Sequence, residues 1–314
     1  MIELHRIDHV GLRVTDVAEA SARWSAQFGL IDRSVSSERA VLACDDEPCA
    51  LELVRAGADG RPGAPGCDHV AFELAPGCSP DDAAAHLASC GVDHRRFDGG
   101  IITHDPDGTE IDLLTYRPPA DPRPPHARPA SGAPLGHPRK LGHVNFLTGD
   151  LSGQVDFYSG VLGMGITDRL GDEGVWLHVN ADHHVMALVD KGYPHLHHFA
   201  LELVDIGHMR MALDHLGRHG RWLGWGPTRH GIGGNIASYV RIPEERCFVE
   251  LYCDMEQLSR HHQPRDWPDD RFSSNTWGPL PPRSYFRFDE EAIESERESA
   301  EMRGIPLTPL EVQT

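Results

Sequence analysis

The chain has 314 residues, 39% of them hydrophobic, and a formal net charge of −19. This length predicts two domains, and the charge disfavours nucleic acid or an anionic membrane as a partner, because phosphate groups would be repelled. No apolar run reaches the about 18 residues of a membrane span, no secretion signal precedes the first strand, and the seven cysteines lack zinc-type spacing. We therefore expect a cytoplasmic protein with reduced thiols.

The first 116 residues contain the elements of two similar βαβββ modules. Alternating apolar residues at 10–14 predict a strand, and residues 17–28 predict an amphipathic helix closed by a glycine. The second module begins with the strand CDHVAFEL at 67–74 and continues with a helix at 81–89. A DPDG turn then separates the last two strands of the module.

The same pattern restarts after a proline-rich stretch. Residues 117–140 contain eight prolines and no periodicity, so we interpret them as an extended linker. Residues 141–254 then repeat the elements of 1–116, which predicts an α+β fold of two tandem domains. Each domain is expected to be a pair of βαβββ modules forming a curved mixed sheet around a central cavity. Residues 255–314 form a tail with a candidate lid, for which surface packing is the alternative, and an acidic helix at 289–302 that we expect to be solvated.

Six histidines lie in two short apolar segments between Trp176 and Leu203. Neutral imidazole is the commonest protein ligand of transition metals and a good acid or base near neutral pH. Two imidazoles and one carboxylate on one face of a divalent metal form a facial triad that leaves coordination positions open. The repeat pairs one such set in each half, His9, His69 and Asp112 with His143, His198 and Glu250.

The segments LGHVNF, HVMALVDKGYPHLHHFALEL, GPTRHGIGGNIASYV and FVELY resemble type I extradiol catechol dioxygenases of the vicinal oxygen chelate superfamily. The resemblance implies Fe(II), or Mn(II) on the same ligands, held by His143, His198 and Glu250. It implies extradiol (meta) cleavage of a catecholic substrate by O₂ to a muconic semialdehyde-type product, an activity of EC 1.13.11 type in aromatic degradation. It also implies a homo-oligomer, with a tetramer favoured.

The resemblance gives three further residues a catalytic role. His184 is expected to be the acid or base that serves the oxygen chemistry, and the neighbouring His183 is its rival. His230 and Tyr239 are expected to donate hydrogen bonds to the substrate. We expect His197 to be structural, because adjacent residues of a strand face opposite sides of the sheet.

Three positions are expected to contact the substrate together with His230 and Tyr239. Asn145 faces the same side of its strand as His143, and Trp176 matches an aromatic position of the pocket. Trp225 stands where the homoprotocatechuate-cleaving branch has an arginine that grips the substrate carboxylate. An apolar or neutral-substituted catechol is therefore expected, unless Arg271 or Arg283 in the tail compensates.

Two alternatives from other classes stay open. One is a non-catalytic metal- or drug-binding protein of the same superfamily. The intact triad and its flanking residues argue against this alternative. The other is a glyoxalase-like metalloenzyme, in which more carboxylate ligands would be expected around the metal. In the first half the flanking residues have no counterparts, so we expect His9, His69 and Asp112 to be a retired site.

Overall fold

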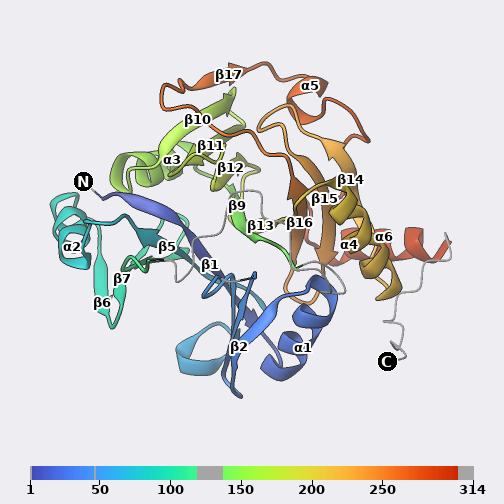
Figure 1. Cartoon of the computed structure of the whole chain (residues 1–314), viewed down its shortest axis with the longest axis horizontal. Coiled ribbons are helices and arrows are strands. Elements are labelled where there is room, and N and C mark those ends of the chain that lie inside the picture. Colours follow the sequence, from blue (N-terminus) through green and yellow to red (C-terminus); the bar gives the residue numbers. More distant parts are fainter. Residues whose placement is uncertain (1, 46, 119–136, 303–314) are drawn as a thin grey trace.

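The computed structural model describes residues 2–45, 47–118 and 137–302 (Figure 1). Most of the predicted linker, residues 119–136, lies outside these ranges. The described residues form two large mixed sheets of eight and nine strands, which confirms the predicted α+β fold with two tandem units. No helix in the described ranges is both long and apolar enough to cross a membrane.

The N-terminal sheet has the strand order β2-β3-β4-β1-β5-β8-β7-β6. The β1–β4 and β5–β8 pairs are parallel and the other neighbours are antiparallel, as two copies of one βαβββ module require. Its elements are β1 (Leu4–Val14), α1 (Val17–Phe28), β2 (Ile31–Val35), β3 (Arg39–Ala43), β4 (Leu51–Arg55), η1 (Ala58–Gly60), β5 (Gly66–Leu74), α2 (Pro80–Ser89), β6 (His94–Phe97), β7 (Gly100–His104) and β8 (Glu110–Leu114).

The C-terminal sheet repeats this plan in the order β14-β15-β16-β13-β9-β12-β11-β10 and adds β17 at its edge. Its strands are β9 (Lys140–Thr148), β10 (Gly165–Leu170), β11 (Gly174–His178), β12 (Met186–Asp190), β13 (His195–Glu202), β14 (Leu223–Arg229), β15 (Ile236–Ile242), β16 (Cys247–Cys253) and β17 (Arg265–Trp267). Its helical segments are α3 (Leu151–Val155), η2 (Asp156–Val161), α4 (Ile206–Arg218), α5 (Arg271–Ser274) and α6 (Glu290–Met302).

Local sequence explains where the main helices begin and end. The Asp16 side chain accepts a hydrogen bond from the Glu19 amide and caps α1, and Gly29 ends that helix with a φ of 70°, which a glycine adopts without strain. Ser79 and Asp82 form a reciprocal capping box at the start of α2. These helices follow the first strand of each module and pack on its sheet, so the predicted modules and the observed ones coincide.

The two halves share one hydrophobic core. Their sheets lie side by side (Figure 1), and a single cluster of buried side chains draws residues from both. Trp24 of α1 packs on Phe199 of β13, with ring centroids 5.6 Å apart. Beside it, the Arg23 guanidinium is 2.5 Å from the buried Glu245 carboxylate. The second sheet is therefore held in place by contacts with the first.

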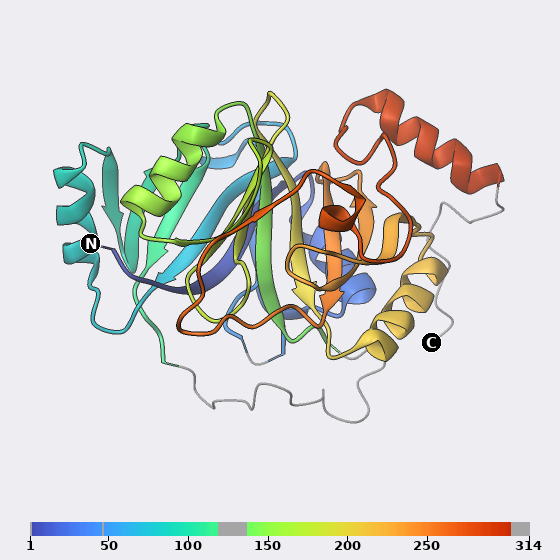
Figure 2. The same ribbon diagram turned by 90° about the horizontal axis from the view of Figure 1, so that it is seen from above.

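The tail returns over the second sheet (Figure 2). Strand β17 pairs in parallel with β10, and α6 is tied down by Arg241 of β15. Both Glu296 carboxylate oxygens bind the Arg241 guanidinium, at 2.6 and 2.7 Å, and the backbone carbonyls of Ser284 and Arg287 accept further hydrogen bonds from it. Glu296 therefore departs from the solvated face expected for the acidic helix.

We expect the Arg241→Met substitution to destabilise the attachment of the tail. Arg241 is buried, and removing one partner of a buried ion pair costs about 3–5 kcal/mol because the other charge is left unpaired. A lower thermal midpoint and faster proteolytic cleavage near residue 285 would both report this loss. The surface pair of Arg287 and Asp289 supplies the control, and an Arg287→Met variant that is equally unstable would contradict the assignment.

Candidate metal centre and its pocket

Three neighbouring strands bring two histidines and a glutamate together. His143 on β9 and Glu250 on β16 both lie level with Ala200 of the strand between them, β13. His198 is two residues before Ala200, so its side chain points to the same face of the sheet. Because the register aligns all three positions, ligands far apart in the sequence converge on one point.

The three side chains have the geometry of a metal-binding group. Their ligand atoms lie within 4.8 Å of one another, and all three residues are buried. The Nε2 atoms of His143 and His198 lie 3.0 and 3.1 Å from the same oxygen of Glu250. Burial alone would raise the pKa of Glu250, but the two histidines outweigh it and hold that pKa well below its ordinary value. The group is thus an anionic oxygen between two imidazole nitrogens.

The His198 ring is oriented by its neighbour His197. His197 Nε2 donates to the Tyr285 carbonyl at 2.8 Å, so its Nδ1 is left to accept a hydrogen bond from His198 Nδ1 at 2.7 Å. His198 Nε2 then presents a lone pair toward Glu250, an arrangement that favours a cation between them. Burial also lowers the pKa of His198 to about 4, which keeps the ring neutral. The donor set therefore fits a divalent transition metal.

His197 reaches His198 because β13 is irregular at this point. The pairing of β13 with β9 shifts register between Leu196 and His198, so simple alternation along the strand does not hold there. Asn235 is a second residue whose role the sequence did not reveal. Its amide donates to the other oxygen of Glu250 at 2.7 Å, and this fixes the carboxylate plane. The signal for Asn235 was its place within the quoted segment GPTRHGIGGNIASYV.

His184 lies over the triad at the end of a hydrogen-bonded chain. Its ring centroid is 4.2 Å from that of His143. The chain starts at Asp168, which accepts from His183 Nε2 at 3.0 Å, and His183 Nδ1 lies 3.0 Å from His184 Nδ1. Since His183 Nε2 holds the proton toward Asp168, His183 Nδ1 accepts from His184, whose Nε2 is left bare. Of the two candidates for the acid or base, His184 lines the pocket and His183 lies behind it, so the geometry favours His184.

Charge and burial prepare this chain for proton chemistry. Burial would raise the pKa of Asp168, but hydrogen bonds from His183 and Arg265 bring it below its ordinary value. Burial, with His143 and His183, lowers the pKa of His184 well below its ordinary value, so its ring is neutral. A neutral imidazole backed by an ionised carboxylate can take up a proton at its free nitrogen.

We expect Asp168→Asn to slow turnover by roughly 10–100-fold without loss of the metal, the usual cost of removing a group that orients a functional histidine. The amide keeps the size of the side chain but offers His183 a weaker, uncharged acceptor. Turnover rate and metal content of the same preparation would test this. Glu256→Gln is the control, since the Glu256 side chain also pairs with Arg265, whereas Glu256 bonds His183 only through its backbone carbonyl, which the substitution leaves in place. An equal loss in the control would assign the effect to Arg265 instead.

His230 and Tyr239 form a second pair at the pocket. His230 Nδ1 donates to the Ser274 carbonyl at 2.8 Å, so its Nε2 accepts from the Tyr239 hydroxyl at 2.8 Å. Both protons of the pair are used in these bonds, so the Tyr239 oxygen is left to accept a hydrogen bond from a bound molecule, in place of the expected donation by His230 and Tyr239. Trp225 stacks on Tyr239 with the ring planes 12° apart, and its indole donates to the Pro279 carbonyl.

A cavity of about 190 Å³ joins these groups. Every predicted site residue lines it: His143, Asn145, Trp176, His184, His198, Trp225, His230, Tyr239 and Glu250. Tyr285 and Phe286 of the tail complete an aromatic wall that the sequence did not assign. Among the described lining residues Lys191 is the only lysine or arginine, so Arg271 and Arg283 do not reach the cavity.

Residues 140–243 match the family model described as "Glyoxalase/Bleomycin resistance protein/Dioxygenase superfamily". "Metapyrocatechase 2" of Cupriavidus necator is 28% identical over 311 residues, covering 90% of this chain and 92% of that protein. A Mn(II)-bound glyoxalase from Novosphingobium aromaticivorans has a similar structure, with a TM-score of 0.76, 22% identity and coverage of 90% of this chain and 94% of that chain.

A variant of homoprotocatechuate 2,3-dioxygenase from Brevibacterium fuscum has the same fold, with a TM-score of 0.77 and 19% identity over 91% of this chain and 82% of that chain. These likenesses extend over both halves, beyond the region that the family model matches. The chain is therefore similar over both halves to these two-domain proteins, and its residues 140–243 match the glyoxalase, bleomycin resistance protein and dioxygenase superfamily.

Proposed function

We propose that this protein is an extradiol catechol dioxygenase, which uses O₂ to open a catecholic ring beside its hydroxyl groups and yields a muconic semialdehyde-type product. The observation that supports it most is the triad of His143, His198 and Glu250 at one cavity with His184 and the pair of Tyr239 and His230. The name of the Cupriavidus necator relative and the homoprotocatechuate dioxygenase fold support the same activity.

We assign Fe(II) to the triad, with Mn(II) as the ion that suits the same ligands. A divalent ion bound there supplies Lewis acidity, which lowers the cost of losing a phenolic proton, and open positions where catechol and O₂ meet. His197 and Asn235 keep the ligands oriented for this ion, through His198 Nδ1 and the second Glu250 oxygen.

The other residues have separate tasks in proton transfer. Tyr239 accepts a phenolic proton at its oxygen while its own proton moves to His230 Nε2, along the 2.8 Å hydrogen bond between them. The Ser274 carbonyl then stabilises the charged His230 ring through Nδ1. On the other side of the cavity, His184 Nε2 takes up and returns a proton at the reacting oxygen, with its Nδ1 held by His183.

The walls of the cavity favour a catechol without an acidic substituent. Trp176, Trp225 and Phe286 present aromatic surface, which excludes water and packs on an aromatic ring. The one lining lysine, Lys191, lies 3.7 Å from Glu173 and over the Phe286 ring, so its charge is already shared. The negative charge of a substrate carboxylate would therefore be neutralised less well here than in a site with a free arginine.

An aerobic assay of the iron-loaded protein distinguishes the candidate functions. A methylcatechol is expected to give the yellow semialdehyde faster than homoprotocatechuate does. Tight binding of unchanged catechol would instead indicate a metal- or drug-binding protein. Isomerisation of a glutathione hemithioacetal, with no ring cleavage, would indicate a glyoxalase, although Glu250 is the only carboxylate of the described triad.

A cytoplasmic location and a homotetramer belong to the same proposal. They are supported by the resemblance to extradiol dioxygenases. Light scattering on the purified protein tests the oligomeric state. A monomer that cleaves catechols would contradict the proposed tetramer but not the proposed activity.

A further inference from the structure

A second group of histidines and carboxylates lies in the N-terminal sheet. His9 on β1, His69 on β5 and Glu52 on β4 come from three adjacent strands, and their ligand atoms lie within 4.8 Å of one another. Its two histidines are related to His143 and His198 by the internal repeat. His9 lies level with Ala71 as His143 lies level with Ala200, and His69 faces Gly11 as His198 faces Asn145.

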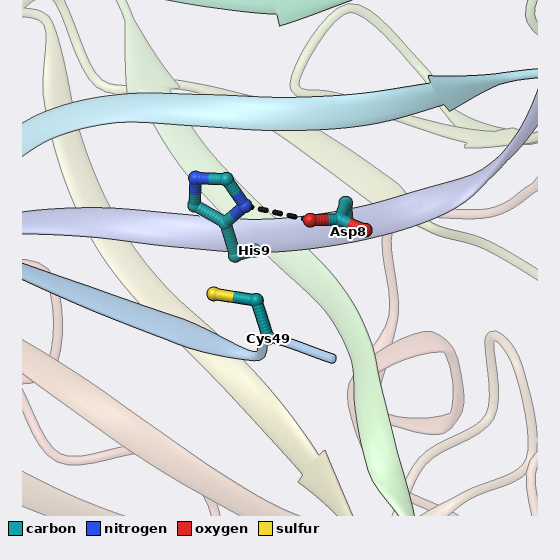
Figure 3. Close-up of side chains that lie close together, drawn as sticks. All are labelled: Asp8, His9 and Cys49. Carbon is teal, nitrogen blue, oxygen red and sulfur yellow. Dashed lines mark hydrogen bonds and ion pairs between the residues drawn. The ribbon is translucent and has the colours of Figure 1, made fainter. Parts of the chain in front are cut away.

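The protons on both imidazoles are fixed by ionised carboxylates. His9 Nδ1 donates to Asp8 at 2.7 Å (Figure 3), and His69 Nδ1 donates to Asp68 at 3.0 Å. Both aspartates are ion-paired, Asp8 with Arg6 and Asp68 with Arg61, so they act as acceptors only. Each ring therefore has its proton on Nδ1, in the carboxylate–histidine arrangement that accompanies metal ligands.

The two remaining nitrogens face each other without a proton of their own. His9 Nε2 is 2.9 Å from His69 Nε2 and 3.5 Å from a Glu52 oxygen. The same Glu52 oxygen also accepts from Arg39 at 2.5 Å, which offsets its charge. The two imidazole lone pairs 2.9 Å apart still repel one another unless a cation lies between them. In Figure 3 this nitrogen of His9 faces away from both Asp8 and Cys49, so the cation site is on the Glu52 and His69 side.

Asp112 gives independent support. It occupies the position that Glu250 has in the second half, because it lies level with Ala71 on the next strand, β8. Asp112 is only 9% exposed, and its Oδ1 has no hydrogen-bond partner among the described residues. A buried carboxylate oxygen without a partner costs free energy, which a bound cation would recover.

The backbone around the group leaves room for the rings and closes it to a substrate. A Cβ on Gly11 would come within 2.3 Å of the His69 ring, so the imidazole occupies the space of a side chain. Glu52 faces Gly11 on β4, whereas the equivalent residue of the second half, Ala187, faces Asn145 and lines the cavity. Glu52 thus occupies the space that is part of the open cavity in the second half. A metal site closed by protein ligands in this way is typical of structural sites, whereas catalytic sites keep one position open.

We propose that His9, His69 and Glu52 bind a second divalent metal, with zinc the ion best suited to them, as a structural centre near the buried carboxylate of Asp112. Two imidazoles and carboxylate oxygens are a common donor set of four-coordinate Zn(II). This inference differs from the expectation of a retired site in the first half. It does not depend on the proposed dioxygenase activity, because it concerns a different sheet and a metal without open positions.

The experiment measures zinc in the full chain after the catalytic triad has been disabled. The His198→Ala, Glu250→Gln double variant is stripped with a chelator, incubated with excess Zn(II), desalted and analysed by mass spectrometry for metals. We expect one equivalent of zinc per chain, and a thermal midpoint that rises on addition of zinc because the ion binds the folded state. Adding His69→Gln should abolish both effects, whereas adding His104→Gln, at an exposed histidine of the same sheet, should abolish neither.

Two results would overturn the proposal. Absence of zinc from the double variant would mean that a proton, and not a metal, lies between His9 and His69. Retention of a full equivalent after His69→Gln would place the zinc elsewhere in the chain. Because the first measurement leaves the N-terminal sheet unaltered, it remains decisive even if the His69→Gln variant does not fold.

Discussion

Replacing His198 with alanine is expected to remove one equivalent of metal from the chain and to abolish ring cleavage at the same time. His198 supplies one of three ligand nitrogens and oxygens, and the remaining pair of His143 and Glu250 cannot hold an ion against exchange as three ligands do. Loss of the metal removes the Lewis acidity on which every later step depends. Metal content and the rate of semialdehyde formation, measured on one preparation, would test this expectation.

His261→Ala provides the matched control, since it removes an exposed imidazole from the same half of the chain. That variant should keep both metal and activity. A His198→Ala protein that retains its metal and its rate would show that the triad is not the catalytic metal site. A variant that has lost the metal but still binds catechol would instead support the assignment of His198 as a metal ligand.

Replacing His184 with alanine is expected to keep the metal and to slow turnover by about 10²–10⁴-fold, the usual contribution of general acid–base catalysis. His184 is not one of the three residues of the metal-binding group, so its loss leaves the ligands in place. Its Nδ1 is hydrogen-bonded to His183, and its free Nε2 faces the cavity. The effect should fall on turnover rather than on substrate binding, because the proton is transferred only during the reaction. Steady-state kinetics with a methylcatechol would measure it.

A double-mutant cycle makes this prediction sharper. If Asp168 acts only through His183 and His184, the Asp168→Asn substitution should have no further effect in the His184→Ala background. Additive losses would mean that Asp168 supports the site by another route, such as its ion pair with Arg265. A wild-type rate for His184→Ala itself would remove this residue from the mechanism.

The fold and the triad were predictable because the two halves of the sequence repeat the same pattern and can be compared with each other. The repeat aligned His143 and His198 with histidines at the same places in the first half, and the resemblance assigned both to one metal. Parallel pairing of β13 with β16 then brought Glu250 alongside without any local motif. The positions of Trp176 and Trp225 at the cavity followed from the resemblance.

The supporting residues were not predictable, for three physical reasons. Asp168 reaches His183 across strands, and no spacing in the sequence records that contact. His197 was assigned to the wrong side because the local register shift breaks the alternation on which the assignment rested. Glu52 escaped notice because the repeat has alanine at the equivalent position, so the comparison of halves pointed to Asp112 instead.

The packing of Trp24 against Phe199 has a consequence for the handling of this molecule. An indole ring that packs on β13, the strand bearing the His198 ligand, makes the N-terminal half an intramolecular folding partner for the second half. A fragment starting at residue 140 would expose that aromatic surface to water and leave the acidic side chain of Glu245 without its guanidinium. Deleting the N-terminal half is therefore expected to destabilise the half that carries the triad.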